Sequence, residues 1–391
     1  MAPWAGAVVL ALALPAAAAG PTADGVPTRA GVVAGQGDVV PLPADRGAVG
    51  ATGRADGAEP GPSTADSLVL RDDLGRTVRL PGPPDRIVSL VPAATELLFA
   101  LDAGDRLVGR TRYGVHPPAA REVPSVGQGI RPSLELVLER RPGLVLLFAG
   151  PETRGTADRL EELGVPTLAL RHNSFSDLRR NVRRLGRLTG RERAAGELLG
   201  TIRCRLRRVA GAVRGRPRPR VYYEVWSDPP VTVGRGSYLD SLLSVAGARN
   251  VFGDLRAPSP RVGLEAVAAR DPDLVLVPRR GGGDGGPRPA RRPGWDVVPA
   301  VREGRVRTVD GDLVHRLGPR VGQAAGALAT VIHPGREEAL RSLELERCDS
   351  GPDAPAADRA VPEPEAEAPS ASPADPAARP EPGTPPPAPR R

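Results

Sequence analysis

The sequence of 391 residues contains no lysine, so all 54 of its basic side chains are arginine. Aromatic residues make up only 3% of the chain. A protein that binds nucleic acid usually combines a basic surface with aromatic side chains on which bases stack. The net charge of +8 therefore reflects an arginine-rich composition and not a nucleic-acid partner. The densest basic run, Arg179–Arg193, is expected to be the solvated face of a helix.

Signatures of catalysis are also absent. The chain has no G-x-S-x-G motif, and neither cysteine lies in a cationic loop with a histidine. The run Gly281–Gly286 lacks the Lys-Ser/Thr pair and the following helix of a phosphate-binding loop. These absences argue against an enzyme, and we assign no catalytic residues.

Cysteine occurs only at Cys204 and Cys348. No cysteine follows Met1–Gly20, whose apolar run and small-residue cleavage site are typical of a secretory signal. This segment predicts a soluble protein that is exported to the periplasm without a lipid anchor. In such a protein Cys204, within a helix, and Cys348, after the last helix, either form a disulfide or remain unpaired thiols.

Two segments, 21–66 and 348–391, are rich in alanine, proline and acidic or glycine residues and lack apolar periodicity. Such segments bury too little apolar surface to offset the entropy of ordering the chain. We therefore expect a disordered linker and a disordered tail on either side of a folded part at 67–347.

A thirteen-residue pattern, L-E-x-V-x-x-R-x-P-x-L-V-L, occurs at 134–146 and again at 264–276. The units of a solenoid repeat after roughly 20–50 residues, far closer than these two copies. The wider spacing predicts two lobes of one architecture. Each copy places a glutamate, Glu135 or Glu265, in the first turn of a short helix that leads into a buried strand.

The order of predicted elements repeats too, beginning with strands at Arg86–Leu90 and Arg220–Val225. Alternating strands and helices predict an α/β fold with two Rossmann-like lobes on parallel central sheets. Apolar periodicity between the halves predicts one long, rigid connecting helix, divided at Gly190. The expected parts are a lobe with a leading β-hairpin at 67–173, the connecting helix at 174–215 and a second lobe at 216–347.

Several segments in combination resemble a known family. They are Asp72–Arg79 (DDLGRTVR), Arg86–Glu96 (RIVSLVPAATE), Glu265–Val275 and Val306–Arg320 (VRTVDGDLVHRLGPR). They resemble the ABC-importer substrate-binding proteins that have a helical backbone and bind vitamin B12, ferric siderophores or haem. The resemblance covers about 67–335 and is closest to the cobalamin-binding branch, which Thr111–Pro118 (TRYGVHPP) also resembles. It implies a ligand cleft between the lobes.

The resemblance also implies that Glu135 and Glu265 are surface residues that dock on arginine pockets of the permease. A glutamate in the first turn of a helix is favoured by the helix dipole, which alone would explain each copy. The duplication favours docking, because a two-lobed protein on a permease dimer needs one anchor for each subunit.

Candidate ligand-binding residues follow the strands, at the edge where open α/β sheets bind ligands. Thr95 either lines the cleft or caps the next helix. Tyr113 is similar to a ligand-stacking tyrosine of the family, or is an ordinary loop residue, and Trp226 either faces the cleft or packs in the core. The full set is Pro92, Ala93, Thr95, Tyr113, Gln128, Gly129, Trp226, Ser237, Tyr238, Asp312, His315 and Arg316.

Some of these candidates have simpler explanations. Ser237 and Tyr238 can serve only to cap and pack the start of a helix. Arg316 can pair with an amide or carboxylate of the ligand or with a neighbouring aspartate.

The four histidines are too few for a receptor of a bare zinc or manganese ion, which needs three or four converging ligands. Only His116 and His315 are expected to reach the cleft, and His172 and His333 are not. Tyr113, His116 and His315 remain possible axial ligands to a cobalt or iron macrocycle.

The expected ligand is a cobalamin or related corrinoid, with a ferric siderophore or haem as the alternative. The expected partner is the permease dimer of an inner-membrane ABC importer, and the protein is expected to be monomeric. No cofactor is expected beyond this cobalt- or iron-containing ligand.

Overall fold

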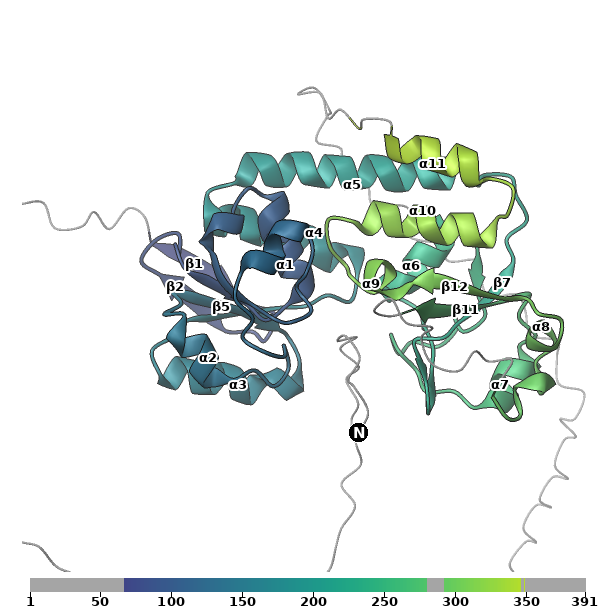
Figure 1. Ribbon diagram of the computed structural model, residues 1–391, viewed down its shortest axis with the longest axis horizontal. Helices are drawn as coiled ribbons and strands as arrows, with labels where there is room; N and C mark the ends of the chain where they lie inside the picture. Colours follow the sequence, from purple (N-terminus) through teal and green to yellow (C-terminus); the bar gives the residue numbers. More distant parts are fainter. Residues whose placement is uncertain (1–66, 280–291, 346–347, 349–391) are drawn as a thin grey trace, which may run out of the picture.

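The computed structural model describes residues 67–279, 292–345 and 348. The expected signal segment, the linker 21–66, the tail from 349 and the run Gly281–Gly286 lie outside the described residues. Two four-stranded parallel sheets with helices on both faces form two α/β lobes, as the sequence predicts (Figure 1).

The N-terminal lobe has the strand order β4-β3-β5-β6. Ile87 of the central strand pairs in register with Leu107 on one side and Leu144 on the other. The expected hairpin, β1 and β2, precedes the sheet, and Gly75 supplies the positive φ of 87° that its turn requires. The strands are β1 (Leu68–Arg71), β2 (Thr77–Leu80), β3 (Ile87–Ser89), β4 (Leu107–Arg110), β5 (Leu144–Phe148) and β6 (Thr167–Leu170). The helices are α1 (Pro92–Ala100), α2 (Leu134–Glu139), α3 (Pro151–Glu162) and α4 (Phe175–Thr189), with single 3₁₀ turns at Gly104–Arg106 and Pro118–Glu122.

The C-terminal lobe has the matching order β10-β7-β11-β12, again parallel throughout. Its strands are β7 (Arg220–Tyr223), β10 (Arg249–Asn250), β11 (Leu274–Arg279) and β12 (Val306–Asp310), and a small antiparallel pair is formed by β8 (Trp226–Ser227) and β9 (Pro230–Val231). Its helices are α6 (Tyr238–Val245), α7 (Leu264–Ala269), α8 (Pro299–Arg302), α9 (Gly311–Val314), α10 (Val321–Ile332) and α11 (Glu337–Leu345), with a 3₁₀ turn at Trp295–Val297.

The duplicated sequence pattern corresponds to duplicated structure. Residues 131–148 and 261–278 have the same order of buried, half-buried and exposed positions, residue for residue. After each glutamate helix, Arg141 and Asp271 adopt positive φ angles of 47° and 38°. An arginine at the start of each central strand, Arg86 or Arg220, donates to carbonyl oxygens at the end of that helix. The two lobes are therefore copies of one unit.

The connection expected at 174–215 consists of two helices that are divided at Gly190, as the sequence predicts, and only the second of them is long. Gly190, with a φ of 67°, ends α4, and α5 (Glu192–Ala212) begins after it. The two helices pack closely, because a Cβ on Gly186 would lie 2.7 Å from the Cβ of Ala195. Only α5 extends over the second lobe, where it meets α10 and α11 (Figure 1).

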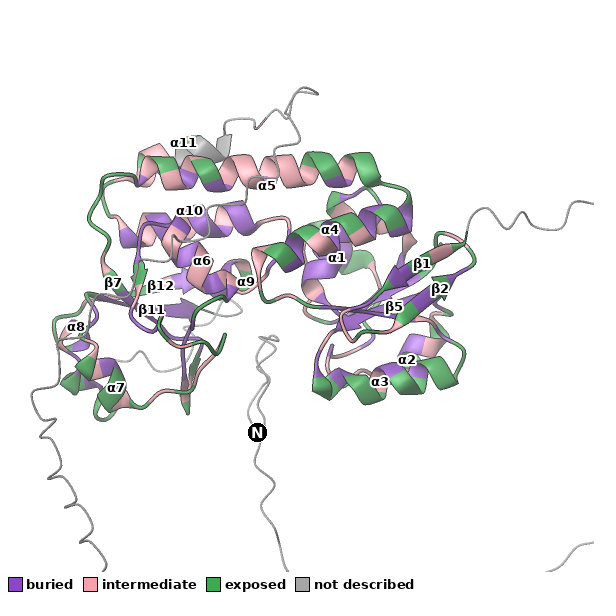
Figure 2. Cartoon of the chain, turned by 180° about the vertical axis from the view of Figure 1, so that it is seen from behind, coloured by how far each residue is buried: buried purple, intermediate pink, exposed green. Residues whose placement is uncertain are grey.

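One apolar cluster runs beneath α5 through both lobes. The inward side chains of α5 join residues of α1 and α4 in one lobe and of α6 and α10 in the other. Separate clusters lie on the opposite face of each sheet, under α2 and α3 or under α7 and α8. The outer faces of α2, α3 and α7 are exposed on the side of the molecule away from α5 (Figure 2).

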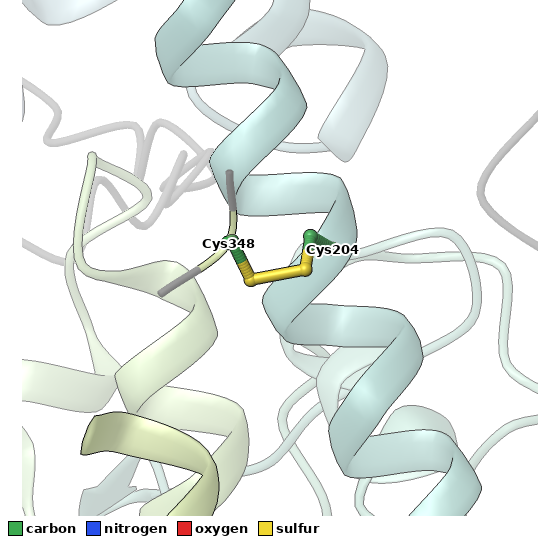
Figure 3. The surroundings of a disulfide bond; sticks show 2 residues. All are labelled: Cys204 and Cys348. Carbon is green, nitrogen blue, oxygen red and sulfur yellow. A yellow bond between two sulfur atoms is a disulfide. The ribbon is translucent and has the colours of Figure 1, made fainter. Parts of the chain in front are cut away.

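The two cysteines form a disulfide, the pairing that the sequence left open. Cys204 lies within α5 and Cys348 follows α11, with their Cα atoms 6.0 Å apart (Figure 3). The bond ties the end of the described chain to the helix that spans both lobes.

Candidate functional site

The predicted site residues lie on the connections that leave the carboxyl edges of the two sheets. Because all strands within each sheet are parallel, these connections share one edge in each lobe. The two edges meet at the junction of the lobes. There the backbone N–H of Tyr238 donates to the carbonyl of Asn173 at 2.7 Å, and Gly318 lies against Ala93.

The loop after β4 is organised by a buried arginine that sequence reasoning missed. Arg110 is 8% exposed, and its guanidinium donates to the carbonyls of Ala120 at 2.6 Å and of Thr111 and Arg121 at 3.0 Å. Burial, followed by the charge of Arg121, lowers the pKa of Arg110. The only sequence signal was an arginine as the last residue of a strand, a position usually taken to be solvated.

Two candidate side chains project from this loop. Tyr113 is half-buried, and Arg112 donates to its hydroxyl at 2.8 Å while lying over its ring. His116 is half-buried at the junction. Burial, and then the positive charge of Arg320, lowers the pKa of His116, so its imidazole is neutral near pH 7.

The candidates after β3 are mostly inaccessible. Thr95 is fully buried, and its hydroxyl donates to the carbonyl of Val91 at 3.4 Å. The N-cap of α1 is Val91, so the alternative that Thr95 caps this helix is wrong. Ala93 is buried at the junction, whereas Pro92 is half-buried.

The stretch Gln128-Gly129 contributes one accessible side chain and one tight packing position. Gln128 is half-buried. A Cβ at Gly129 would lie 2.4 Å from the carbonyl oxygen of Leu90, so only glycine fits there. Gly129 thus packs the loop against the end of β3.

In the second lobe Trp226 is 42% exposed, so the alternative of core packing is wrong. Its indole N–H donates to the carbonyl of Asp228 at 2.8 Å, which fixes the ring on the β8–β9 hairpin. Ser237 caps α6 by accepting from the N–H of Asp240. Tyr238 is half-buried and packs against the apolar cluster under α5, and burial of its hydroxyl raises the pKa of that group. Ser237 and Tyr238 therefore cap and pack the start of α6, which was the simpler of the two explanations for them.

The connection after β12 brings charged and aromatic groups to the junction. His315 is hydrogen-bonded through Nε2 to the hydroxyl of Tyr223 at 2.9 Å. Asp312 is exposed and lies 3.5 Å from Arg316. Arg316 also reaches Glu96 of the other lobe at 3.3 Å, a partner that sequence reasoning did not foresee.

The two glutamates of the repeat are exposed in the first turns of α2 and α7. Among the described residues, neither carboxylate is within ion-pair distance of an arginine or histidine. The two helices begin differently, since Ser133 accepts from the N–H of Leu136 whereas Gly263 offers no side chain.

Within the described part of the chain, no cluster of three or more His, Cys, Asp or Glu side chains is suited to hold a metal ion. Nor does any described helix combine the length and apolar character needed to cross a membrane.

The architecture is that of a bilobal substrate-binding protein. It has two α/β lobes with parallel sheets, a long helix that spans both lobes, and aromatic and charged side chains at the junction of the lobes. The chain belongs to the periplasmic binding protein family, whose model matches residues 87–313. It is a substrate-binding protein of the ABC-transporter type and not an enzyme.

Individual relatives agree with this assignment. The chain is 29% identical over 277 residues to an uncharacterized ABC transporter substrate-binding lipoprotein, YvrC, of Bacillus subtilis, covering 68% of this chain and 86% of the relative. It is 25% identical to a vitamin B12-binding protein of Vibrio parahaemolyticus, covering 61% and 86%. A periplasmic haem-binding protein of Pseudomonas aeruginosa superposes with a TM-score of 0.57 at 30% identity, covering 64% and 94%.

Proposed function

We propose that this protein captures a cobalamin or related corrinoid between its lobes outside the inner membrane and delivers it to an ABC permease. The observation that carries the delivery role is the duplicated, exposed glutamate helix. The two glutamates stand in the first turns of α2 and α7, one helix on each lobe, and these helices lie on the side of the molecule away from α5 (Figure 2). Two equivalent carboxylates of this kind fit a partner with two equivalent basic sites.

The junction residues support a large, partly flat ligand. Trp226 and Tyr113 offer aromatic surface with polar edges, one from each lobe. Such rings suit the face of a corrin, which is apolar with polar substituents at its rim. Pro92, Gln128, Asp312, His315 and Arg316 complete the proposed lining of the site.

A ferric siderophore or haem is the second candidate, and one observation favours it. Arg316 and Arg320 share the single buried carboxylate of Glu96, which leaves positive charge between the lobes. The exposed Asp312 offsets this only partly, because its charge is screened by solvent. A chelate with carboxylate groups would benefit from this charge.

The proposed cellular setting follows from the sequence. We propose that Met1–Gly20 directs export, that the mature protein is soluble in the periplasm without a lipid anchor, and that it works as a monomer on a permease dimer.

The docking assignment is tested by substituting both glutamates, Glu135→Ala with Glu265→Ala. Uptake into cells or permease vesicles should be lost while ligand affinity stays unchanged, because both side chains lie away from the junction. The matched control is Glu192→Ala, which removes an exposed first-turn glutamate from α5 on the other side of the molecule. A fall in ligand affinity, or uptake equal to the control, would show that the glutamates do not dock.

A further inference from the structure

A buried carboxylate at the junction is held by two arginines of the opposite lobe. Glu96 of α1 is 1% exposed. Arg320 donates to it twice, from Nε to Oε2 at 2.8 Å and from Nη2 to Oε1 at 2.7 Å. Arg316 adds one longer bond of 3.3 Å to the same Oε1. Paired charge-assisted bonds of the kind made by Arg320 fix geometry as well as adding energy.

The position of this cluster gives it a mechanical role. The helix α5 spans both lobes, and a helix restrains bending of the two lobes better than it restrains their rotation about its own axis. Glu96 belongs to α1, and the two arginines lie between α9 and α10. The helices α1 and α10 pack with α5 in one apolar cluster, so this contact lies beside α5 and not on its axis. A contact off the axis of α5 opposes this rotation.

We propose that Glu96 and Arg320 form an interlobe clasp that fixes the angle between the lobes, and that Arg316 is dispensable for it. Without Arg316, Glu96 keeps two short bonds and an opposite charge. Without Arg320, the one hydrogen bond left to the buried carboxylate from the described residues is the long bond to Arg316, which Asp312 also attracts. A buried charge that loses its main partner is strongly unfavourable, so the lobes should separate to let water reach it.

The clasp has a consequence that rests on the proposed function. Because Glu135 and Glu265 belong to different lobes, the angle between the lobes sets the distance between the two docking carboxylates. A fixed angle keeps both in position for one partner, which lowers the ordering cost of docking.

The test is a distance measurement between spin labels on the two lobes. Asp158→Cys in α3 and Ala269→Cys in α7 place labels at exposed sites outside the junction. The two native cysteines are bonded to each other and do not react. The parent protein should give one narrow distance distribution, Arg320→Met a broader one displaced to longer distance, and Arg316→Met the parent distribution.

A second variant separates positioning from stability. Glu96→Met with Arg320→Met removes both charges and leaves apolar side chains of similar size, so the protein should fold even if Arg320→Met alone does not. It should still show the broad distribution. A parental distribution in this double variant, or equal broadening by Arg316→Met, would overturn the proposal. The measurement needs neither ligand nor permease, so its outcome is independent of the proposed function.

Discussion

The two lobes are alike in the segments that face outward and unlike in the segments that face each other. From 131 to 148 and from 261 to 278 the lobes match in pattern of burial, in backbone turn and in the arginine that closes the glutamate helix. At the junction, by contrast, the first lobe has a loop wrapped around Arg110, and the second has the β8–β9 hairpin with Trp226.

This contrast separates two kinds of constraint. A partner built from two equal subunits favours equal surfaces on both lobes. A single ligand with no such symmetry favours different side chains from each lobe. Four predictions test how far the equivalence of the lobes extends.

The largest expected effect concerns the disulfide between Cys204 and Cys348, which joins α5 to the end of the second lobe and has no counterpart in the first. Cys204→Ser with Cys348→Ser should lower the free energy of unfolding by about 4 kcal/mol, because the bond closes a loop across a sequence separation of 144 residues. Denaturant unfolding measures this loss, and reduction of the parent protein should reproduce it. A loss below about 1 kcal/mol would mean that apolar packing of α11 already provides the restraint.

The next effect is an acid sensitivity that His172 gives to the first lobe. His172 follows β6, and burial lowers its pKa from 6.5 to about 4. The unfolded chain therefore binds a proton that the folded one does not, so stability is lost as the pH falls from 6.5 towards 4. The loss should approach roughly 3 kcal/mol. His172→Asn should remove this part of the pH dependence in unfolding curves at pH 7 and pH 4.5. An identical pH dependence in both proteins would show that His172 titrates normally.

Equivalence of the two glutamates is testable one lobe at a time. Glu135→Ala and Glu265→Ala should each reduce uptake by a similar factor, roughly tenfold, or 1.4 kcal/mol of docking free energy. Transport assays at saturating ligand compare the two directly. If one substitution accounts for the whole loss, the lobes dock unequally and the duplication has another cause.

The smallest effects come from the different caps of the glutamate helices. Ser133→Ala should destabilise by about 1 kcal/mol through loss of the bond to the N–H of Leu136. Gly263→Ser should stabilise by a few tenths of a kcal/mol, because the new hydroxyl can make the same bond. Thermal unfolding distinguishes the loss of stability from the gain. Destabilisation by Gly263→Ser would show that a serine cannot cap α7 as Ser133 caps α2.

Local patterns were enough to predict the fold. The duplicated pattern at 134–146 and 264–276 and the alternation of elements predicted two parallel α/β lobes, and Gly190 marked the break between α4 and α5. The sequence did not reveal that the chain changes direction at Gly190. That change depends on the packing of Gly186 against Ala195, a contact between two helices that local patterns do not encode.

The site was less predictable for a physical reason. Position after a strand identified the right connections, but not which side chains remain accessible. Thr95 is covered by its own helix and by the Tyr113 loop, whereas Trp226 is exposed. The role of Arg110 depends on the fold of the loop that follows it, whose carbonyl oxygens it binds. The role of Glu96 depends on a partner distant in sequence, Arg320, at a separation of 224 residues.

The most direct test of the account is calorimetric titration of the protein beginning at residue 21 with cyanocobalamin, beside haemin and a ferric hydroxamate siderophore. The account predicts one-to-one binding of cyanocobalamin, tighter than either iron ligand and weakened by Trp226→Ala. Absence of heat with cyanocobalamin, together with tight binding of an iron chelate, would contradict the corrinoid assignment. Absence of binding with all three would contradict a chelate site between the lobes.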